Sequence, residues 1–293
     1  MPTKELALKG RLVSFVTDDG VRLNGFVHGG RKGGDCVINV HGMTGNFYGI
    51  RQMLLAEMLA RKGIAFFSIN TRGHDAVSSY RTEGGRVKGK RVKAGTNFER
   101  FEECVPDIKA AIGAARRMGF RGITLCGHST GCQKVIYYQY RSGDKRVKSL
   151  ILLGPADDYN IAKADLGKDF ARIAKLAEGL VARGKGDETH ELIPSGFSAQ
   201  RFDSTVNLDR IEARILNYDG ELKEFSRIRI PILAMFGTRE EFAVKRVGTC
   251  LRILEGRTRS SNYRWHVVKG ADHSFKGHER ELAGRMVDWV RSL

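Results

Sequence analysis

The stretch ITLCGHSTGCQ (residues 123–133) decides how the fold of this chain is interpreted. It places Ser129 between Gly127 and Gly131, directly after a short apolar run and before a helix-like run. A nucleophilic serine must stand clear of the backbone, and a sharp strand-to-helix turn achieves this when the residues two positions away on either side are small. The helix that follows directs its N-terminal N–H groups at the same point. The pattern therefore favours a nucleophile at Ser129 over a small residue that only makes a tight turn.

Eight strand-like runs organise the 293-residue chain. They lie at residues 11–17, 21–28, 36–40, 66–70, 123–126, 149–153, 232–236 and 265–268. The first two are separated by Asp18-Asp19-Gly20, a turn signal typical of a β-hairpin. Helical spacings of apolar residues lie between most of the other runs, at 47–58, 101–112, 135–140 and 282–293. This alternation predicts an α/β fold with a mainly parallel, eight-stranded sheet covered by helices on both faces.

The segment between the sixth and seventh runs is too long for a single crossover. It contains a helical run, DFARIAKLAEGLVARG (169–184), and an amphipathic stretch around residues 208–216. We therefore expect residues 1–154 and 231–293 to form the core and residues 155–230 to form an inserted helical cap. Five aromatic side chains of this segment are expected to form mainly the core of the cap, with an acyl or aryl pocket as the alternative. They are Tyr159, Phe170, Phe197, Phe202 and Tyr218.

A second irregular stretch, residues 74–97, is strongly basic. Its cationic residues are Arg81, Arg86, Lys88, Lys90, Arg91 and Lys93. We expect a solvated surface loop, with a loop at the mouth of the substrate site as the alternative. The formal net charge of +17 favours encounters with anionic partners, and the basic loop 81–93 suggests an anionic ester. The basic residues are spread along the chain without a nucleic-acid-binding motif, so no dedicated nucleic-acid partner is expected.

Composition limits the remaining classes of protein. Hydrophobic residues make up 41% of the chain, and no apolar run approaches the roughly 20 residues of a membrane-spanning helix. The start, MPTKELALKGRL, lacks the apolar core of a signal peptide, so we expect a cytoplasmic protein. The five cysteines lack metal-site spacing, and no nucleotide-binding glycine motif is present, so no metal or other cofactor is expected. The sequence leaves the oligomeric state open.

Activation of the serine requires a base and a carboxylate that orients it. His273 lies in GADHSF, just after the last strand-like run, and is the expected base. The carboxylate should fall between the serine and the histidine in the chain, and Glu240 in FGTREEF occupies the favoured place after the seventh run. Glu241 is one alternative. Asp157 or Asp158, just after the sixth run, is the other.

Donors to a developing oxyanion are expected where the third run ends, in NVHGMTGN (39–46). The His-Gly pair allows the chain to turn sharply there. The backbone N–H of Met43 is therefore one candidate, and that of Thr130, next to the serine, is the other. His41 itself is interpreted as a structural residue that braces this loop.

The ordered motifs resemble those of the α/β-hydrolase superfamily over essentially the whole chain. They are HG (41–42), RGHD (72–75), GHSTG (127–131), the carboxylate after the seventh strand and ADHSF (271–275). The resemblance implies a triad of Ser129, His273 and Glu240, and hydrolysis through an acyl-enzyme. Glutamate in place of the commoner aspartate is a departure from the pattern of the superfamily.

Two short stretches, GHSTGCQ (127–133) and FSAQRFDS (197–204), are also similar to a branch that includes fungal siderophore esterases and many uncharacterised proteins. Ser129 separates the chain from haloalkane dehalogenases and epoxide hydrolases, whose pattern has aspartate there. We expect a serine carboxylesterase that acts on small-to-medium esters, with anionic or aromatic esters among them. The alternatives are cleavage of amide, thioester or carbon–carbon bonds by the same triad, or a low-turnover ligand-binding protein on a hydrolase scaffold.

Overall fold

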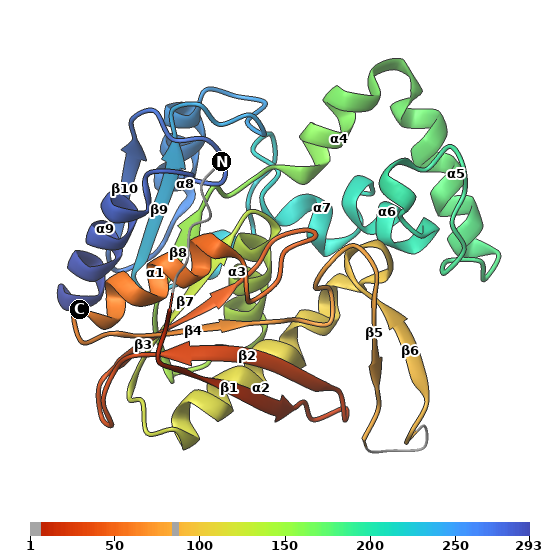
Figure 1. Ribbon diagram of the computed structural model, residues 1–293. Helices are drawn as coiled ribbons and strands as arrows, with labels where there is room; N and C mark the ends of the chain where they lie inside the picture. Colours follow the sequence, from red (N-terminus) through yellow and green to blue (C-terminus); the bar gives the residue numbers. More distant parts are fainter. Residues whose placement is uncertain (1–6, 84–87) are drawn as a thin grey trace, which may run out of the picture.

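The computed structural model describes residues 7–83 and 88–293, and an eight-stranded sheet lies at its centre (Figure 1). Its strands are β1 (Gly10–Val16), β2 (Arg22–His28), β3 (Asp35–Val40), β4 (Ala65–Ile69), β7 (Gly122–His128), β8 (Val147–Leu153), β9 (Ile232–Gly237) and β10 (Tyr263–Val268). They follow the order β1-β2-β4-β3-β7-β8-β9-β10. β1 pairs with β2 and β2 with β4 in antiparallel fashion, whereas all other neighbours are parallel. The predicted α/β fold, its eight strands and its first hairpin are confirmed.

β7 lies near the middle of this sheet. It pairs with β3 on one side and with β8 on the other, and almost every residue of the three strands is buried. Continuous burial explains the unbroken apolar runs seen in the sequence. Because parallel strands end at the same edge of a sheet, the turn after β7 lies next to the turns after β3 and β8.

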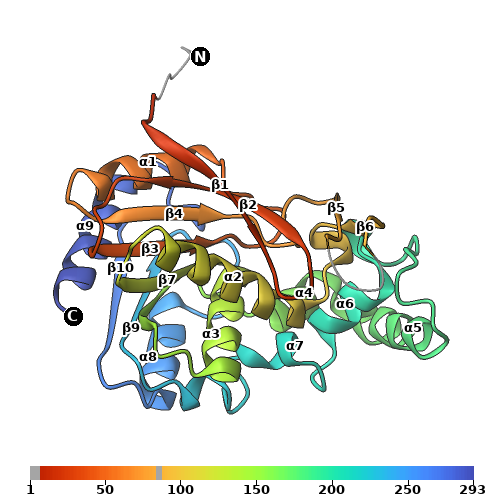
Figure 2. The same ribbon diagram turned by 90° about the horizontal axis from the view of Figure 1, so that it is seen from below.

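Helices cover both faces of the sheet. They are α1 (Ile50–Ala60), α2 (Cys104–Arg117), α3 (Thr130–Ser142), α8 (Val247–Arg257) and α9 (Glu279–Arg291). α1 and α9 pack on one face, and Figure 2 shows α2, α3 and α8 along the other. Successive residues of β3 divide between the two layers, since Val37 belongs to the first and Ile38 to the second. The core is therefore built on both sides of the sheet.

The helix predicted over residues 47–58 is shifted in the structure. It begins at Ile50, and its buried side is formed by Leu55, Ala56 and Leu59. Ile50, which shares the predicted apolar spacing, is 59% exposed and lines the cavity described below. Apolar spacing predicts a helix, but it does not tell whether a given side chain faces the core or a cavity.

The basic stretch predicted as a surface loop contains a small antiparallel ribbon of β5 (Ser78–Arg81) and β6 (Arg91–Ala94). Tyr80 is partly buried against the main core, and the guanidinium of Arg72 lies 5.8 Å from the centre of its ring. The many cationic side chains of this stretch hid the alternation of buried and exposed positions in the sequence. Arg86, named among the basic residues, lies outside the described residues.

Between β8 and β9 the chain forms α4 (Asp158–Leu166), α5 (Phe170–Ala182), α6 (Ala199–Val206) and α7 (Ile211–Ile215). In both views α4, α5 and α6 lie together at one end of the molecule, with β5 and β6 beside α6 (Figures 1 and 2). These three helices share a hydrophobic cluster of their own, whereas α7 packs in the main core beside α3. The helix predicted at 169–184 corresponds to α5, but α4 and α6 were not predicted. The division of the chain at residues 155 and 230 stays a prediction.

Within the described ranges, no helix has the length and apolarity needed to span a bilayer.

Candidate active site

Ser129 occupies the sharp turn between β7 and α3. Its backbone has φ 56° and ψ −130°, a conformation that residues with side chains rarely adopt. A side chain at Gly127 would collide with the carbonyl of Gly131, and a side chain at Gly131 would collide with the carbonyl of Val40. The N–H of Ser129 donates to the carbonyl of Leu153 at 2.9 Å, which joins the turn to the end of β8. Crowding on both sides of the serine therefore requires glycine at both positions.

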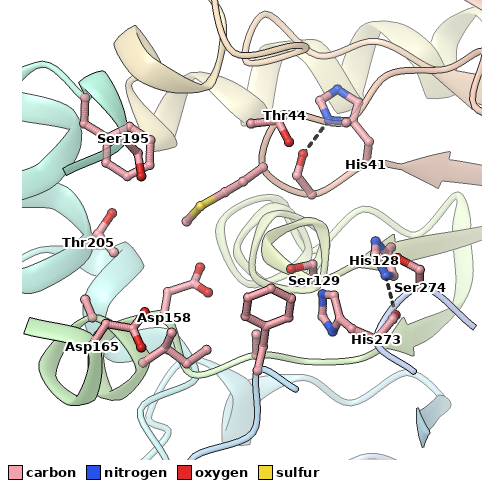
Figure 3. Close-up of a pocket in the computed structure, with 18 of the residues that line it drawn as sticks. His41, Thr44, His128, Ser129, Asp158, Asp165, Ser195, Thr205, His273 and Ser274 are labelled. Carbon is pink, nitrogen blue, oxygen red and sulfur yellow. Dashed lines mark hydrogen bonds between the residues drawn. The ribbon is translucent and has the colours of Figure 1, made fainter. Parts of the chain in front are cut away.

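Ser129 lies in the wall of a cavity of about 740 Å³ (Figure 3). α4 and α6 contribute apolar side chains to one wall, among them Ile161 and Phe202. α1 and the loop before α9 contribute to the other, through residues that include Ile50 and His273. The volume falls within the range of sites for small organic molecules.

The imidazole of His273 lies beside Ser129 in Figure 3 and belongs to the loop between β10 and α9. Its Nδ1 is 2.6 Å from Oε1 of Glu240, which follows β9, and both side chains are almost fully buried. The two atoms are in contact, but the pair does not have the geometry of a hydrogen bond. Catalytic hydrogen bonds are often poorly aligned before substrate binds and tighten in the complex.

Two further contacts hold the main chain of His273. Its N–H donates to Oε2 of Glu241 at 2.9 Å, and its carbonyl lies 2.9 Å from Nε2 of His128. Burial holds the pKa of His128 well below its usual value, so this ring is neutral and its Nε2–H donates to the carbonyl. Sequence reasoning missed both contacts, because they are made with the backbone of the loop and no motif records them.

The other carboxylates considered from the sequence have different partners. Asp157 caps the N-terminus of α4, and Asp158 accepts a hydrogen bond from the hydroxyl of Thr130 at 3.0 Å. In the described part of the chain, Glu240 is the one of the four candidates whose carboxylate contacts the ring of His273. The geometry therefore brings together Ser129, His273 and Glu240.

The predicted oxyanion donors belong to segments packed against Ser129. Thr130 begins α3, so its N–H has no partner within the helix. Met43 lies in the turn after β3, which is closed by a hydrogen bond of 3.2 Å from the N–H of Gly45 to the carbonyl of Gly42. A Cβ atom on Gly42 would lie 2.7 Å from Cβ of Ser129. This turn is therefore in direct contact with the serine.

His41 braces the same turn, in agreement with its interpretation as a structural residue. Its Nε2 accepts a hydrogen bond from the N–H of Thr71 at 3.1 Å, so its Nδ1–H donates to the carbonyl of Gly42 at 2.8 Å. Burial, followed by the nearby Lys134, lowers the pKa of His41 to about 3. The neutral ring has one donor and one acceptor, which these two contacts use.

A buried ionic cluster involves α3, α6 and α7 and lies close to Asp158 in the wall of the cavity. Lys134 of α3 pairs with Glu99 at 2.5 Å, and Arg201 of α6 pairs with Glu212 of α7. All four side chains are at most 2% exposed. A buried charge without a partner would cost several kcal/mol, which explains the pairing. The sequence did not indicate this cluster, because its members come from separate elements.

Solved structures show which fold this chain shares. Est1E from Butyrivibrio proteoclasticus, with ferulic acid bound, is 17% identical and has a TM-score of 0.63, covering 95% of this chain and 98% of its own. A soluble variant of monoglyceride lipase from Saccharomyces cerevisiae, in complex with a substrate analogue, is 15% identical and has a TM-score of 0.66. The match covers 99% of this chain and 98% of the lipase chain. The Pyrococcus furiosus esterase Pf2001 is 17% identical and has a TM-score of 0.61. The match covers 98% of this chain and 91% of the esterase chain. The chain has the α/β-hydrolase fold.

The particular family follows from a match in sequence. Residues 95–292 match the family described as "Protein of unknown function (DUF1749)", and the chain belongs to this family, which is part of the α/β-hydrolase superfamily. The matched region contains Ser129, Glu240 and His273, whereas β1 to β4 and the Met43 turn precede it. No curated protein matches the chain.

Proposed function

We propose that this protein is a serine hydrolase that cleaves carboxylic esters through an acyl-enzyme on Ser129. The observation that carries the proposal is the position of Ser129 in the cavity wall, in a strained turn beside an imidazole that contacts a buried carboxylate. A serine that only made a turn would need neither the cavity nor the His273–Glu240 pair. Strain of this kind is concentrated at functional sites.

In the proposed reaction, Nε2 of His273 takes the proton of the Ser129 hydroxyl as its oxygen attacks the ester carbonyl. Glu240, in contact with Nδ1, fixes the tautomer and stabilises the imidazolium that forms. The imidazolium then gives its proton to the departing alcohol. Water, activated by the same imidazole, hydrolyses the acyl-enzyme and restores the serine.

The N–H groups of Met43 and Thr130 are the proposed donors to the oxyanion. Thr130 stands at the N-terminus of α3, where the unpaired N–H groups carry partial positive charge. In known enzymes the loss of one such donor costs about 3 kcal/mol of transition-state stabilisation. These donors would share the negative charge that develops on the carbonyl oxygen.

The cavity favours small-to-medium esters. Its volume of about 740 Å³ suits a small molecule, and its walls carry apolar side chains such as Phe202 and Phe242. The structural neighbours agree with this class of substrate, since one was solved with ferulic acid and another is a monoglyceride lipase. Because α4 and α6 form one wall of the cavity, we include in the proposal that this segment acts as a cap.

The experiment that tests the proposal compares hydrolysis of p-nitrophenyl acetate, butyrate and octanoate by the wild type and by Ser129→Ala. We expect kcat to fall by at least about four orders of magnitude in the variant. Ser226→Ala, which removes an exposed hydroxyl that does not line the cavity, is the matched control. Full activity in Ser129→Ala, or no hydrolysis of any ester by the wild type, would contradict the proposal. The acyl chain length of the best substrate would indicate the length of the acyl pocket.

A further inference from the structure

Asp158 is a buried carboxylate in the wall of the cavity. It begins α4 and is 8% exposed, and Figure 3 shows it on the other side of Ser129 from His273. Its Oδ2 accepts a hydrogen bond from the hydroxyl of Thr130 at 3.0 Å. Within residues 7–83 and 88–293, no lysine or arginine forms an ion pair with it. A buried carboxylate without a cation is unfavourable, unless a ligand supplies one.

The buried cations nearby already have partners. Lys134 pairs with Glu99, and Arg201 pairs with Glu212. The charges of these two pairs balance, and Asp158 is a third carboxylate near them that has no ion pair of its own in the described residues. The excess negative charge of the cluster is therefore located at the wall of the cavity.

The groups that face Asp158 do not neutralise it. They are the hydroxyl of Thr130 and the amide of Gln133 from α3, Arg201 from α6, and Glu212 from α7. Burial, followed by the Glu212 carboxylate, raises the pKa of Asp158 to about 6. The side chain is therefore anionic at neutral pH and above, and it is protonated in mildly acidic solution.

We propose that Asp158 determines substrate specificity by binding a positively charged, ammonium-bearing group of the substrate, an inference that rests on the proposed ester hydrolysis. Thr130 follows Ser129 directly, so the hydrogen bond from its hydroxyl places the carboxylate close to the site of acylation. Asp165, also on α4, lines the same cavity and adds negative charge to this wall. With the ester carbonyl at Ser129, an ammonium group pointing toward α4 would supply the cation that Asp158 lacks.

The opposite wall of the cavity carries charges of both signs, Arg51 and Lys276 beside Glu279. On the opposite wall, Arg51 donates to the carbonyl of Ser274 at 3.0 Å and lies near the carboxylates of Glu279 and Asp272. The net charge of +17 acts at long range and is screened over about 8 Å at physiological salt. The contact with Asp158 is local and buried. The local charge thus favours a cationic group, the opposite of the anionic ester suggested by the basic loop.

The test uses matched esters that differ only in charge. On the acyl side, phenyl 6-aminohexanoate is the cationic ester, and phenyl heptanoate, in which methyl replaces ammonium, is its neutral partner. The monophenyl ester of adipate is the anionic ester. Shorter and longer homologues of each are also measured. On the alcohol side, butyrylcholine is compared with 3,3-dimethylbutyl butyrate. In either the acyl-side or the alcohol-side comparison, we expect kcat/KM of the cationic ester to exceed that of its neutral partner by about tenfold or more at pH 7.5. The anionic ester should be the poorest substrate. Equal values for each cationic and neutral pair would overturn the inference.

Asp158→Asn keeps the shape of the side chain and an acceptor for Thr130, but it removes the charge. We expect the ratio of kcat/KM for cationic over neutral esters to fall to about one. Asp169→Asn removes the same charge from an exposed position between α4 and α5, where the wild-type carboxylate pairs with Arg172. This control should keep the wild-type ratio. An unchanged ratio in Asp158→Asn, or an equal loss in both variants, would contradict a local role.

Salt and pH provide two further tests of the ratio of kcat/KM for cationic over neutral esters. A preference that disappears in 0.5 M NaCl would be a long-range effect of net charge and would contradict a buried contact. Because Asp158 is ionised above its pKa of about 6, the preference for the cationic ester should be present at pH 7.5 and lost as the pH falls toward 5. A change in a group that acts on both esters of a pair alike cancels in the ratio. A ratio independent of pH would count against Asp158.

A binding measurement separates failure of this inference from failure of the proposed function. In Ser129→Ala, with and without Asp158→Asn, calorimetry compares the binding of hexylammonium with that of hexanol. Tighter binding of hexylammonium that requires Asp158 supports the cation site, even where no ester is turned over. Rapid hydrolysis of phenyl heptanoate with no preference in either assay would retain the ester hydrolase and exclude the cation site.

Discussion

Two buried carboxylates lie on either side of Ser129 and differ in their partners. Glu240 follows β9 and contacts the imidazole of His273, a group that becomes cationic during the proposed reaction. Asp158 begins α4 and contacts a hydroxyl, with no cation of its own in the described part of the chain. Burial is similar at the two positions, so the partners distinguish them. Glu240 therefore suits the carboxylate of the proposed reaction, and Asp158 suits the proposed site for a cationic group.

The largest expected effect comes from the Glu240 side of this comparison. Glu240→Gln keeps the size of the side chain but removes the charge that stabilises the imidazolium and selects its tautomer. We expect kcat for p-nitrophenyl butyrate to fall by three to four orders of magnitude, with little change in KM. Steady-state kinetics check this. Activity close to that of the wild type would move the acid role away from Glu240 and would remove the contrast with Asp158.

The buried ion pair between Arg201 and Glu212, close to Asp158, gives the next largest effect, on stability. Arg201→Met leaves Glu212 buried without its cation, so the free energy of unfolding should fall by about 3–5 kcal/mol. Urea denaturation followed by circular dichroism measures the difference. Arg172→Met, which breaks an exposed ion pair with Asp169, is the control and should change stability by less than about 1 kcal/mol. Equal effects would mean that the cluster does not depend on paired charges.

Asp158 itself should make the native state less stable at neutral pH. Its pKa is raised from 3.8 to about 6, so the folded protein holds this proton more tightly than the unfolded chain. Stability should therefore fall between about pH 4 and pH 6 and level off above that range, a loss of roughly 2–3 kcal/mol. Asp158→Asn should avoid the loss and melt several degrees higher at pH 7.5, with no gain at pH 4. Thermal melts across this range would contradict the assignment if the difference did not depend on pH.

The smallest expected effect concerns the second glutamate near His273. Glu241→Ala removes the acceptor for the N–H of His273, which should loosen the loop and lower kcat by about tenfold. Glu241→Gln keeps an oxygen acceptor and should restore most of the activity. Kinetics of the two variants side by side distinguish positioning from catalysis by charge, because a charge effect would make them equally poor.

Sequence and structure agree most closely where a short segment determines its own geometry. The glycines beside Ser129 are required by contacts within a few residues or with the adjacent strand, so the turn was predictable. The strand runs were equally clear, because central parallel strands are buried on both faces. The β5–β6 ribbon, α4 and α6 were missed, since their polar residues obscure the periodic patterns.

In the candidate site, too, some features could be predicted from the sequence and others could not. His273 and Glu240 were expected to meet because of their order in the chain and their places after the last and the seventh strand-like runs. The structure places Nδ1 of His273 2.6 Å from Oε1 of Glu240. Glu241 was an alternative for the same role, but its carboxylate contacts the backbone of His273, which depends on the direction of a single side chain.

The sequence by itself determined the fold, the strained serine turn and the order of the candidate catalytic residues, because these depend on local periodicity and on motifs at strand ends. Only the tertiary structure decided which carboxylate contacts the imidazole and which one lines the cavity without a cation. The first assignment depends on the segments that follow β9 and β10, and the second on side chains from α3, α4, α6 and α7 that meet in space. Their charges interact through a buried medium that no single segment of sequence describes.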